Sequence, residues 1–65
     1  MNIMLTTACE KKVVNADLSD IIIPVGTAGS VIDIIIEDGK VQFLLEFGDL
    51  DTIEWYSVDE VEEKF

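Results

Sequence analysis

Apolar and polar residues alternate on both sides of an Asp38-Gly39 pair, between Val31 and Phe47. Asp-Gly favours a two-residue hairpin turn, because both central residues of a type I′ turn take positive φ. Side chains alternate between the faces of a strand, so the register set by this turn predicts a core face with Ile32, Ile34, Ile36, Val41, Phe43 and Leu45. The other face would pair Val31 with Glu46, Asp33 with Leu44, and Ile35 with Gln42.

A third strand is predicted from Thr52 to Tyr56, where β-branched and aromatic residues concentrate. A five-residue connection, GDLDT, would place Ile53 and Trp55 on the core face. Glu54 would then lie opposite Glu46, a like-charge pair that disfavours this register. Alternation favours a core position for Trp55 over a place in a peptide-binding groove, and leaves Tyr56 on the opposite face as the better contact residue.

The end of the sequence suggests a short helix. Residues 57–60 have the S-x-x-E form of a capping box, and Val58, Val61 and Phe65 recur at helical spacing. We expect one or two helical turns that close one end of the sheet.

The first third of the chain has a weaker pattern. Residues 3–14 are apolar and β-branched enough for a first strand, and residues 15–24 are expected to form a long loop. The apolar triplet 21–23 before Pro24 is expected to cover the outer face of the sheet rather than hang in solvent. Gly26 and Gly29 are expected to supply a positive φ or a bulge at the entry to the second strand.

These elements predict a mainly β fold in a single domain, residues 1–65. Hydrophobic residues make up 49% of the 65 residues, which is typical of a globular chain. A chain of this length buries only about 60% of its unfolded surface, so its stability margin is thin. We expect about five antiparallel strands in a small, strongly bent sheet, with a short C-terminal helical turn.

The element order resembles a small SH3-like barrel. Three stretches carry the resemblance: VGTAGSV (25–31), LLEF (44–47) and WYSVDEVEE (55–63). The chain is similar in these stretches to KOW-type barrels, to photosystem-accessory barrels and to short bacterial domains of the same type. The resemblance implies an SH3-like barrel, but the basic residues of KOW-type nucleic-acid binders are missing from this sequence.

The charge is negative and unevenly distributed. Fourteen acidic residues and four lysines give a net charge of −10, with no histidine. Residues 1–32 hold three acids and two lysines, whereas residues 33–65 hold eleven acids and two lysines. Such a field repels nucleic acid and anionic membranes and attracts basic partners. The single Cys9 fits a reducing compartment, and the first residues lack the pattern of a secretory signal, so we predict a cytoplasmic protein.

The residue inventory argues against catalysis and against metal or cofactor binding. Without histidine, arginine or a glycine-rich phosphate loop, most acid–base and phosphoryl-transfer designs are missing. Cys9 has only Lys11 and Lys12 nearby in sequence to lower its thiol pKa, so a small, partly buried free cysteine is preferred over a nucleophile. Asp49 and Asp51 offer oxygen ligands but lack the twelve-residue loop of a calcium hand. We predict a non-enzyme without cofactor or metal.

Carboxylates on and around one sheet face are the main functional feature. The candidate partner-binding residues are Asp33, Glu46, Asp49, Asp51, Glu54, Tyr56, Asp59 and Glu60. Simple solubility explains such charge about as well as directed binding does. Carboxylates on a rigid sheet can also imitate DNA phosphates toward a basic protein.

Two functions of different classes follow. The first is a non-catalytic inhibitor of a basic nucleic-acid-handling protein, similar in size and charge to anti-CRISPR, anti-restriction or antitoxin proteins that act by DNA mimicry. The alternative is an accessory subunit that stabilises a larger complex, with the apolar segment 21–24 in its interface. In both cases we expect no direct binding to nucleic acid or to a membrane, and a homodimer is possible.

Overall fold

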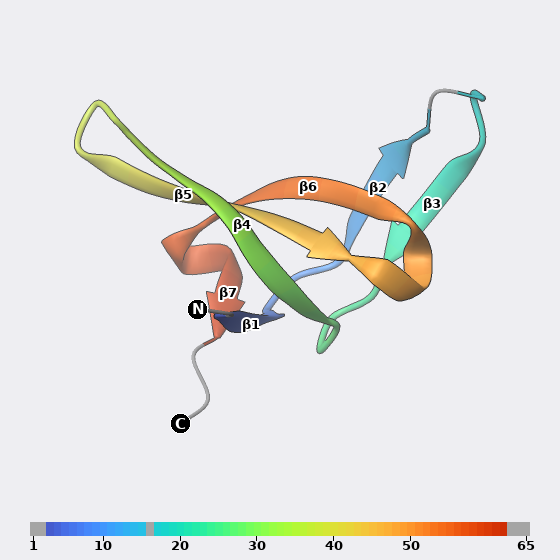
Figure 1. Ribbon diagram of the computed structural model, residues 1–65, viewed down its shortest axis with the longest axis horizontal. Coiled ribbons are helices and arrows are strands. Elements are labelled where there is room, and N and C mark those ends of the chain that lie inside the picture. Colours follow the sequence, from blue (N-terminus) through green and yellow to red (C-terminus); the bar gives the residue numbers. More distant parts are fainter. Residues whose placement is uncertain (1–2, 16, 63–65) are drawn as a thin grey trace.

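The computed structural model describes residues 3–15 and 17–62, and it is mainly β (Figure 1). Five strands form an antiparallel sheet in the order β6-β5-β4-β1-β7. These strands are β1 (Met4–Thr7), β4 (Ala28–Glu37), β5 (Lys40–Phe47), β6 (Thr52–Ser57) and β7 (Val61–Glu62). A separate hairpin consists of β2 (Lys11–Val14) and β3 (Asp20–Ile23). The sheet curls into a half-barrel, and the tip of the β4–β5 hairpin and the β2–β3 hairpin project from it on opposite sides.

The β4–β5 hairpin confirms the predicted turn and most of the predicted register. Asp38 and Gly39 have φ angles of 52° and 75°, and Glu37 lies opposite Lys40. The register holds inward as far as Asp33 opposite Leu44. Beyond this point it is wrong, because a bulge between Val31 and Asp33 places Val31 opposite Leu45 instead of Glu46.

The predicted core face of this hairpin is only partly buried. Leu45 is fully buried, but Ile32, Ile34 and Ile36 are 49%, 49% and 74% exposed. The reason is that the neighbouring strands are shorter than the hairpin: β6 pairs with β5 only as far as Gln42, and β1 pairs with β4 only as far as Ser30. The outer part of the hairpin therefore lacks a covering layer.

Strand β6 exists as predicted, but its faces are reversed. Four residues separate Phe47 from Thr52, with Gly48–Leu50 in a 3-10 turn (η1) and Asp51 in the left-handed region. The predicted connection had five residues, and a one-residue slip moves every side chain of a strand to the other face. Tyr56 consequently lies opposite Phe43 and is buried, whereas Trp55 lies opposite Leu44 on the outer face. The expected Glu46–Glu54 pair does not form, since Glu46 faces Ile53.

The first third of the chain differs most from expectation. The single strand expected over residues 3–14 is divided into β1 and β2, and the expected loop contains β3. Ile23 is fully buried in the core instead of covering the outer face, while Ile22 is 53% exposed. Pairing between β2 and β3 alternates these side chains between the two faces of the hairpin.

The two glycines at the entry to β4 have different roles. Gly26 has φ of +86° and confirms the expected left-handed conformation. Gly29 has no such φ; a Cβ there would lie 2.7 Å from Cε1 of Phe47. The aromatic ring thus packs directly against the backbone of β4.

The capping box is present, although it starts a 3-10 turn. Ser57 and Glu60 bond reciprocally around η2 (Val58–Glu60). Val61 then enters β7 and pairs with Thr7, so the predicted helical spacing does not continue through it. Phe65 lies outside the described residues.

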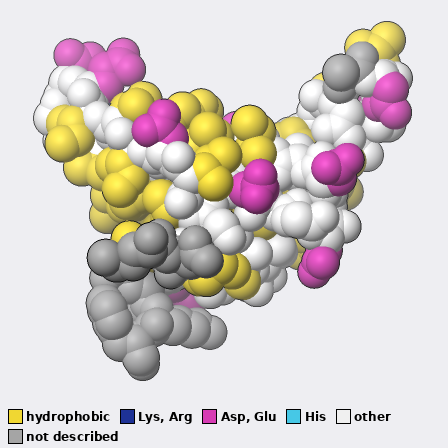
Figure 2. Space-filling view, in the orientation of Figure 1, with side chains coloured by type: hydrophobic (Ala, Val, Ile, Leu, Met, Phe, Trp, Pro, Cys, Tyr) yellow, Lys and Arg dark blue, Asp and Glu magenta, His cyan; other side chains and the backbone are white. Residues whose placement is uncertain are grey.

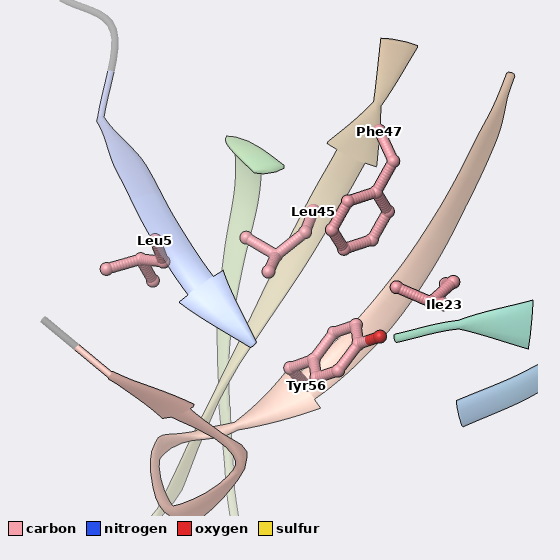
Figure 3. Packing of buried hydrophobic residues seen from close by; sticks show 5 residues of the cluster. All are labelled: Leu5, Ile23, Leu45, Phe47 and Tyr56. Carbon is pink, nitrogen blue, oxygen red and sulfur yellow. The ribbon is translucent and has the colours of Figure 1, made fainter. Parts of the chain in front are cut away.

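The core is small and lies inside the curl of the sheet (Figure 3). Its buried hydrophobic residues are Leu5, Ile23, Leu45, Phe47 and Tyr56. The rings of Phe47 and Tyr56 meet edge to face, with centroids 5.9 Å apart, an arrangement that aromatic pairs prefer. Because Ile23 comes from β3, this cluster fastens the β2–β3 hairpin to the sheet.

Candidate functional site

A polar junction joins β2 to β6 and to the η2 turn. Lys11 Nζ donates a hydrogen bond of 2.7 Å to the Trp55 carbonyl oxygen and lies 3.2 Å from Glu60 Oε1. The same carboxylate oxygen accepts bonds from the backbone N–H and the hydroxyl of Ser57, at 2.9 Å and 3.0 Å. Glu60, a predicted partner-binding residue, is therefore engaged within the fold.

Electrostatics at this junction favour the ionised carboxylate of Glu60 and the protonated thiol of Cys9. Hydrogen bonding from the Ser57 backbone, reinforced by Lys11, holds the pKa of Glu60 below its usual value. Burial and then the Glu60 charge raise the pKa of the Cys9 thiol, whose Sγ lies 3.6 Å from Glu60 Oε2. A nucleophilic cysteine needs a lowered thiol pKa, so this environment disfavours a nucleophilic Cys9. Cys9 is a half-buried free cysteine, as predicted.

Three predicted acids gather at one end of the sheet, and we call them the acidic end: Glu46, Asp49 and Asp51. All three are exposed. Glu46 and Asp51 line a shallow hollow of about 480 Å³, together with Asn15 and Ile53. Glu46 and Asp49 line a second hollow of about 230 Å³. The η1 turn positions this group, because it folds Asp49 and Asp51 back beside the last residues of β5.

The other predicted residues are dispersed. Asp33 is exposed on β4, and Asp59 is exposed on η2. Glu54 is half-buried, and its side chain accepts a 2.8 Å bond from the Trp55 N–H. Tyr56 was expected on the outer face as a contact residue, but it is a fully buried core residue. The single acidic face expected from the sequence is therefore divided among the acidic end, β4 and η2.

The surface that the sequence pattern missed is the projecting part of the β4–β5 hairpin, residues 32–43, which we call the hairpin arm. Ile32, Ile34 and Ile36 are exposed on it. Figure 2 shows apolar side chains along this arm and acidic side chains at its tip. The sequence did carry a signal for this arm. The two strands predicted around the turn span more residues than the predicted third strand, so the third strand could not cover their whole length.

The described residues hold no group of three cysteine or acidic side chains suited to a metal ion. Across residues 3–15 and 17–62, no helix has the length and apolar character needed to cross a bilayer.

Comparison of the chain with protein-family models, with curated proteins and with solved structures finds no match.

Proposed function

We propose that this protein binds a basic protein partner and catalyses no reaction. The observation that carries the proposal is the accumulation of exposed carboxylates that the fold itself does not use. Within the described residues, ion pairs join Lys11 to Glu60 and Lys12 to Asp20. The acidic end takes part in neither pair. Its charge is therefore directed outward, which favours association with a positively charged surface.

The first form of this function is inhibition of a basic nucleic-acid-handling protein, in the manner of an anti-CRISPR, anti-restriction or antitoxin protein that mimics DNA. Support comes from the position of the acidic end, which lies on the last residues of β5 and on the turn that joins β5 to its paired strand β6. A rigid support fixes the spacing of carboxylates, as a phosphate-like surface requires. We place this action in the cytoplasm.

Charge reversal tests the proposal. The partner is first retained from host lysate on the immobilised protein, after nuclease treatment, and eluted with stepped salt. Glu46→Lys/Asp49→Lys should weaken binding at least about tenfold and lower its salt dependence. Glu10→Lys/Glu62→Lys is the matched control, since both acids are exposed and the change in net charge is the same.

Two results would contradict this function in different ways. Equal binding by the two double variants would show that the acidic end is not the contact surface. Simultaneous binding of the partner to this protein and to DNA or RNA would count against inhibition by mimicry, while leaving protein binding intact.

The second candidate is an accessory subunit held mainly by apolar contacts. The exposed isoleucines of the hairpin arm favour it, because exposed apolar surface of this kind marks interaction sites. A salt-resistant complex, weakened by Ile34→Asp but not by Glu46→Lys/Asp49→Lys, would support this candidate over the first.

We also propose that the half-barrel is of the SH3-like type. Its support is the element order: a first strand, a long connection, three sequential antiparallel strands, and a helical turn before the last strand. The long connection is folded into the β2–β3 hairpin, and the helical turn is the single 3-10 turn η2.

A further inference from the structure

Among the described residues, the outer half of β4 has no paired strand on one of its two sides. On the side facing β1, pairing runs through Ala28, Gly29 and Ser30. The last backbone bond on this side runs from the Val31 N–H to the Ile3 carbonyl. No strand among the described residues pairs with β4 beyond it, from Ile32 to Glu37.

The register shows which backbone groups this edge presents. Glu37 and Lys40 flank a two-residue turn, and such a pair exchanges both of its backbone hydrogen bonds. Alternate residues of an antiparallel strand turn their N–H and C=O to opposite sides. Ile34 and Ile36 therefore point these groups away from β5. The Ile34 N–H agrees with this, because it bonds to Asp33 Oδ1 at 2.9 Å.

At the β6 edge of the sheet, side chains bond to backbone groups that point outward. On β6, the Trp55 carbonyl accepts a bond from Lys11, and the Trp55 N–H bonds to Glu54. The Ser57 N–H bonds to Glu60. Side chains thus occupy three outward backbone groups near the end of β6, the N–H and C=O of Trp55 and the N–H of Ser57. Such local blocking is one way that proteins protect an edge from pairing. On the β4 edge, the described residues provide such a cap only for the Ile34 N–H.

The side chains at the β4 edge also suit an added strand. Ile34 and Ile36 are on one face and Ile35 is on the other, and all three are β-branched residues that favour strands. Asp33 and Glu37 bracket them and are exposed. An incoming strand would meet apolar side chains in the middle and negative charge near both ends.

We propose that the β4 edge from Ile32 to Glu37 binds an extended segment of a protein partner as an additional strand. Backbone hydrogen bonds to Ile34 and Ile36 would supply affinity, as in other cases of strand addition. Charge complementarity selects a segment with apolar residues in alternation and lysine or arginine at its ends. This inference rests on the proposed protein-binding function and names how the partner is held.

A second copy of the chain is a poorer occupant. The antiparallel self-pairing that sets Ile34 against Ile36 of another copy also sets Asp33 against Glu37. Like charges directly opposite each other destabilise a sheet, and each copy carries a net charge of −10. A basic segment meets neither penalty.

A proline substitution isolates the edge. Ile36→Pro removes an N–H that points away from β5, so the β4–β5 ladder keeps its bonds, and proline is tolerated on edge strands in this orientation. Ile36→Val keeps both the N–H and the β-branched shape, and it is the matched control. Urea unfolding of both variants establishes that they remain folded before binding is compared.

The probe is a synthetic peptide with alternating valine and threonine and a lysine at each end; the control peptide has glutamate at each end. We expect the lysine peptide to shift the backbone amide signals of residues 32–37 and to slow hydrogen exchange at Ile36. Ile36→Pro should weaken this binding about tenfold, and Ile36→Val should preserve it. The glutamate peptide should bind more weakly.

The outcomes separate the two proposals. Three results would overturn the strand-addition inference. The lysine peptide could bind Ile36→Pro and Ile36→Val equally well, it could shift amide signals elsewhere and not at residues 32–37, or it could fail to bind. Self-association of the free protein that Ile36→Pro abolishes would also overturn it, in favour of a second copy. If the captured partner is lost on charge reversal at the acidic end but retained by Ile36→Pro, the proposed function stands without this inference.

Discussion

Lys11 lies over the face of the Tyr56 ring, with its Nζ 4.4 Å from the ring centroid. One residue belongs to the β2–β3 hairpin and the other to the edge strand β6. The ammonium group bonds at the same time to Trp55 and Glu60. This contact makes Lys11 the polar counterpart of Ile23, which joins the same two parts of the fold through the core.

Replacing Lys11 should weaken the attachment of the β2–β3 hairpin. Lys11→Met keeps an unbranched apolar side chain over Tyr56 but removes the cation and its hydrogen bonds, so we expect a loss of about 1–3 kcal/mol in the free energy of unfolding. Urea denaturation followed by fluorescence measures it. Lys12→Met is the control, because the Lys12–Asp20 pair is exposed and should contribute under about 1 kcal/mol. Equal effects of the two changes would refute a special role for Lys11.

Tyr56→Phe should stabilise the protein. The Tyr56 hydroxyl is buried without a hydrogen-bond partner among the described residues, and it points toward Ile23 in Figure 3. Removing an unsatisfied buried group should gain about 1 kcal/mol, while the ring contacts with Lys11 and Phe47 remain. Tyr56→Leu, which removes the ring, should destabilise. Thermal unfolding at neutral pH compares the three proteins.

The raised pKa of the Tyr56 hydroxyl predicts a loss of stability at alkaline pH. Burial, followed by the negative charges of Cys9, Glu54 and Glu60, raises the pKa of Tyr56 from 10.0 to about 12. A raised pKa in the folded state gives stability that is complete below pH 10 and is lost as pH rises toward 12. The stability advantage of Tyr56→Phe over the wild-type protein should therefore grow across this range. A constant difference would argue against a buried neutral hydroxyl.

The lowered pKa of Glu60 predicts a loss of stability in acid. Its pKa is held below the ordinary value of 4.5, first by the Ser57 backbone N–H. A lowered pKa in the folded state gives stability that is present above pH 4.5 and is lost as pH falls through the folded value. Glu60→Gln should be less stable than the wild-type protein at neutral pH, and the gap should narrow in acid. Urea titrations at a series of pH values test this, and a gap that widens on acidification would contradict it.

Gly29→Ala should destabilise through a steric contact. The added Cβ would lie 2.7 Å from Phe47 Cε1 and 3.1 Å from Leu45 Cβ, and both neighbours are buried. Overpacking of this kind costs about 1–3 kcal/mol. At Gly48 an added Cβ meets nothing within 4 Å, so Gly48→Ala should change stability by less than about 1 kcal/mol. Similar unfolding midpoints for the two variants would show that Phe47 moves aside without cost.

The parts of the fold that the sequence predicted were those set by local chemistry. Asp38-Gly39 specified its turn because both residues take positive φ, and the Ser57–Glu60 capping box formed because its partners are three residues apart. Both features depend on neighbours in the chain. The mainly β character followed from the same local patterns.

In the part of the sheet from β4 to β6, the errors arose where a single residue decided the outcome. One residue fewer in the β5–β6 connection exchanged the faces of Trp55 and Tyr56, and one extra residue at the bulge after Val31 shifted the inner register. Alternation with period two cannot reveal either event, because Ile53, Trp55 and Tyr56 are all apolar enough for a core. The grouping of the acidic end followed from the η1 turn, whose left-handed Asp51 the sequence pattern did not indicate.

The pairing of β7 with β1 has a consequence for how the molecule is made. Thr6 and Thr7 find their partners at Glu62 and Val61, almost the whole described chain away. β1 therefore leaves the ribosome before its partner β7 exists as a complete strand. Contacts between such distant residues close large loops and slow folding. We expect the β1–β7 pairing to be the last step that completes the sheet.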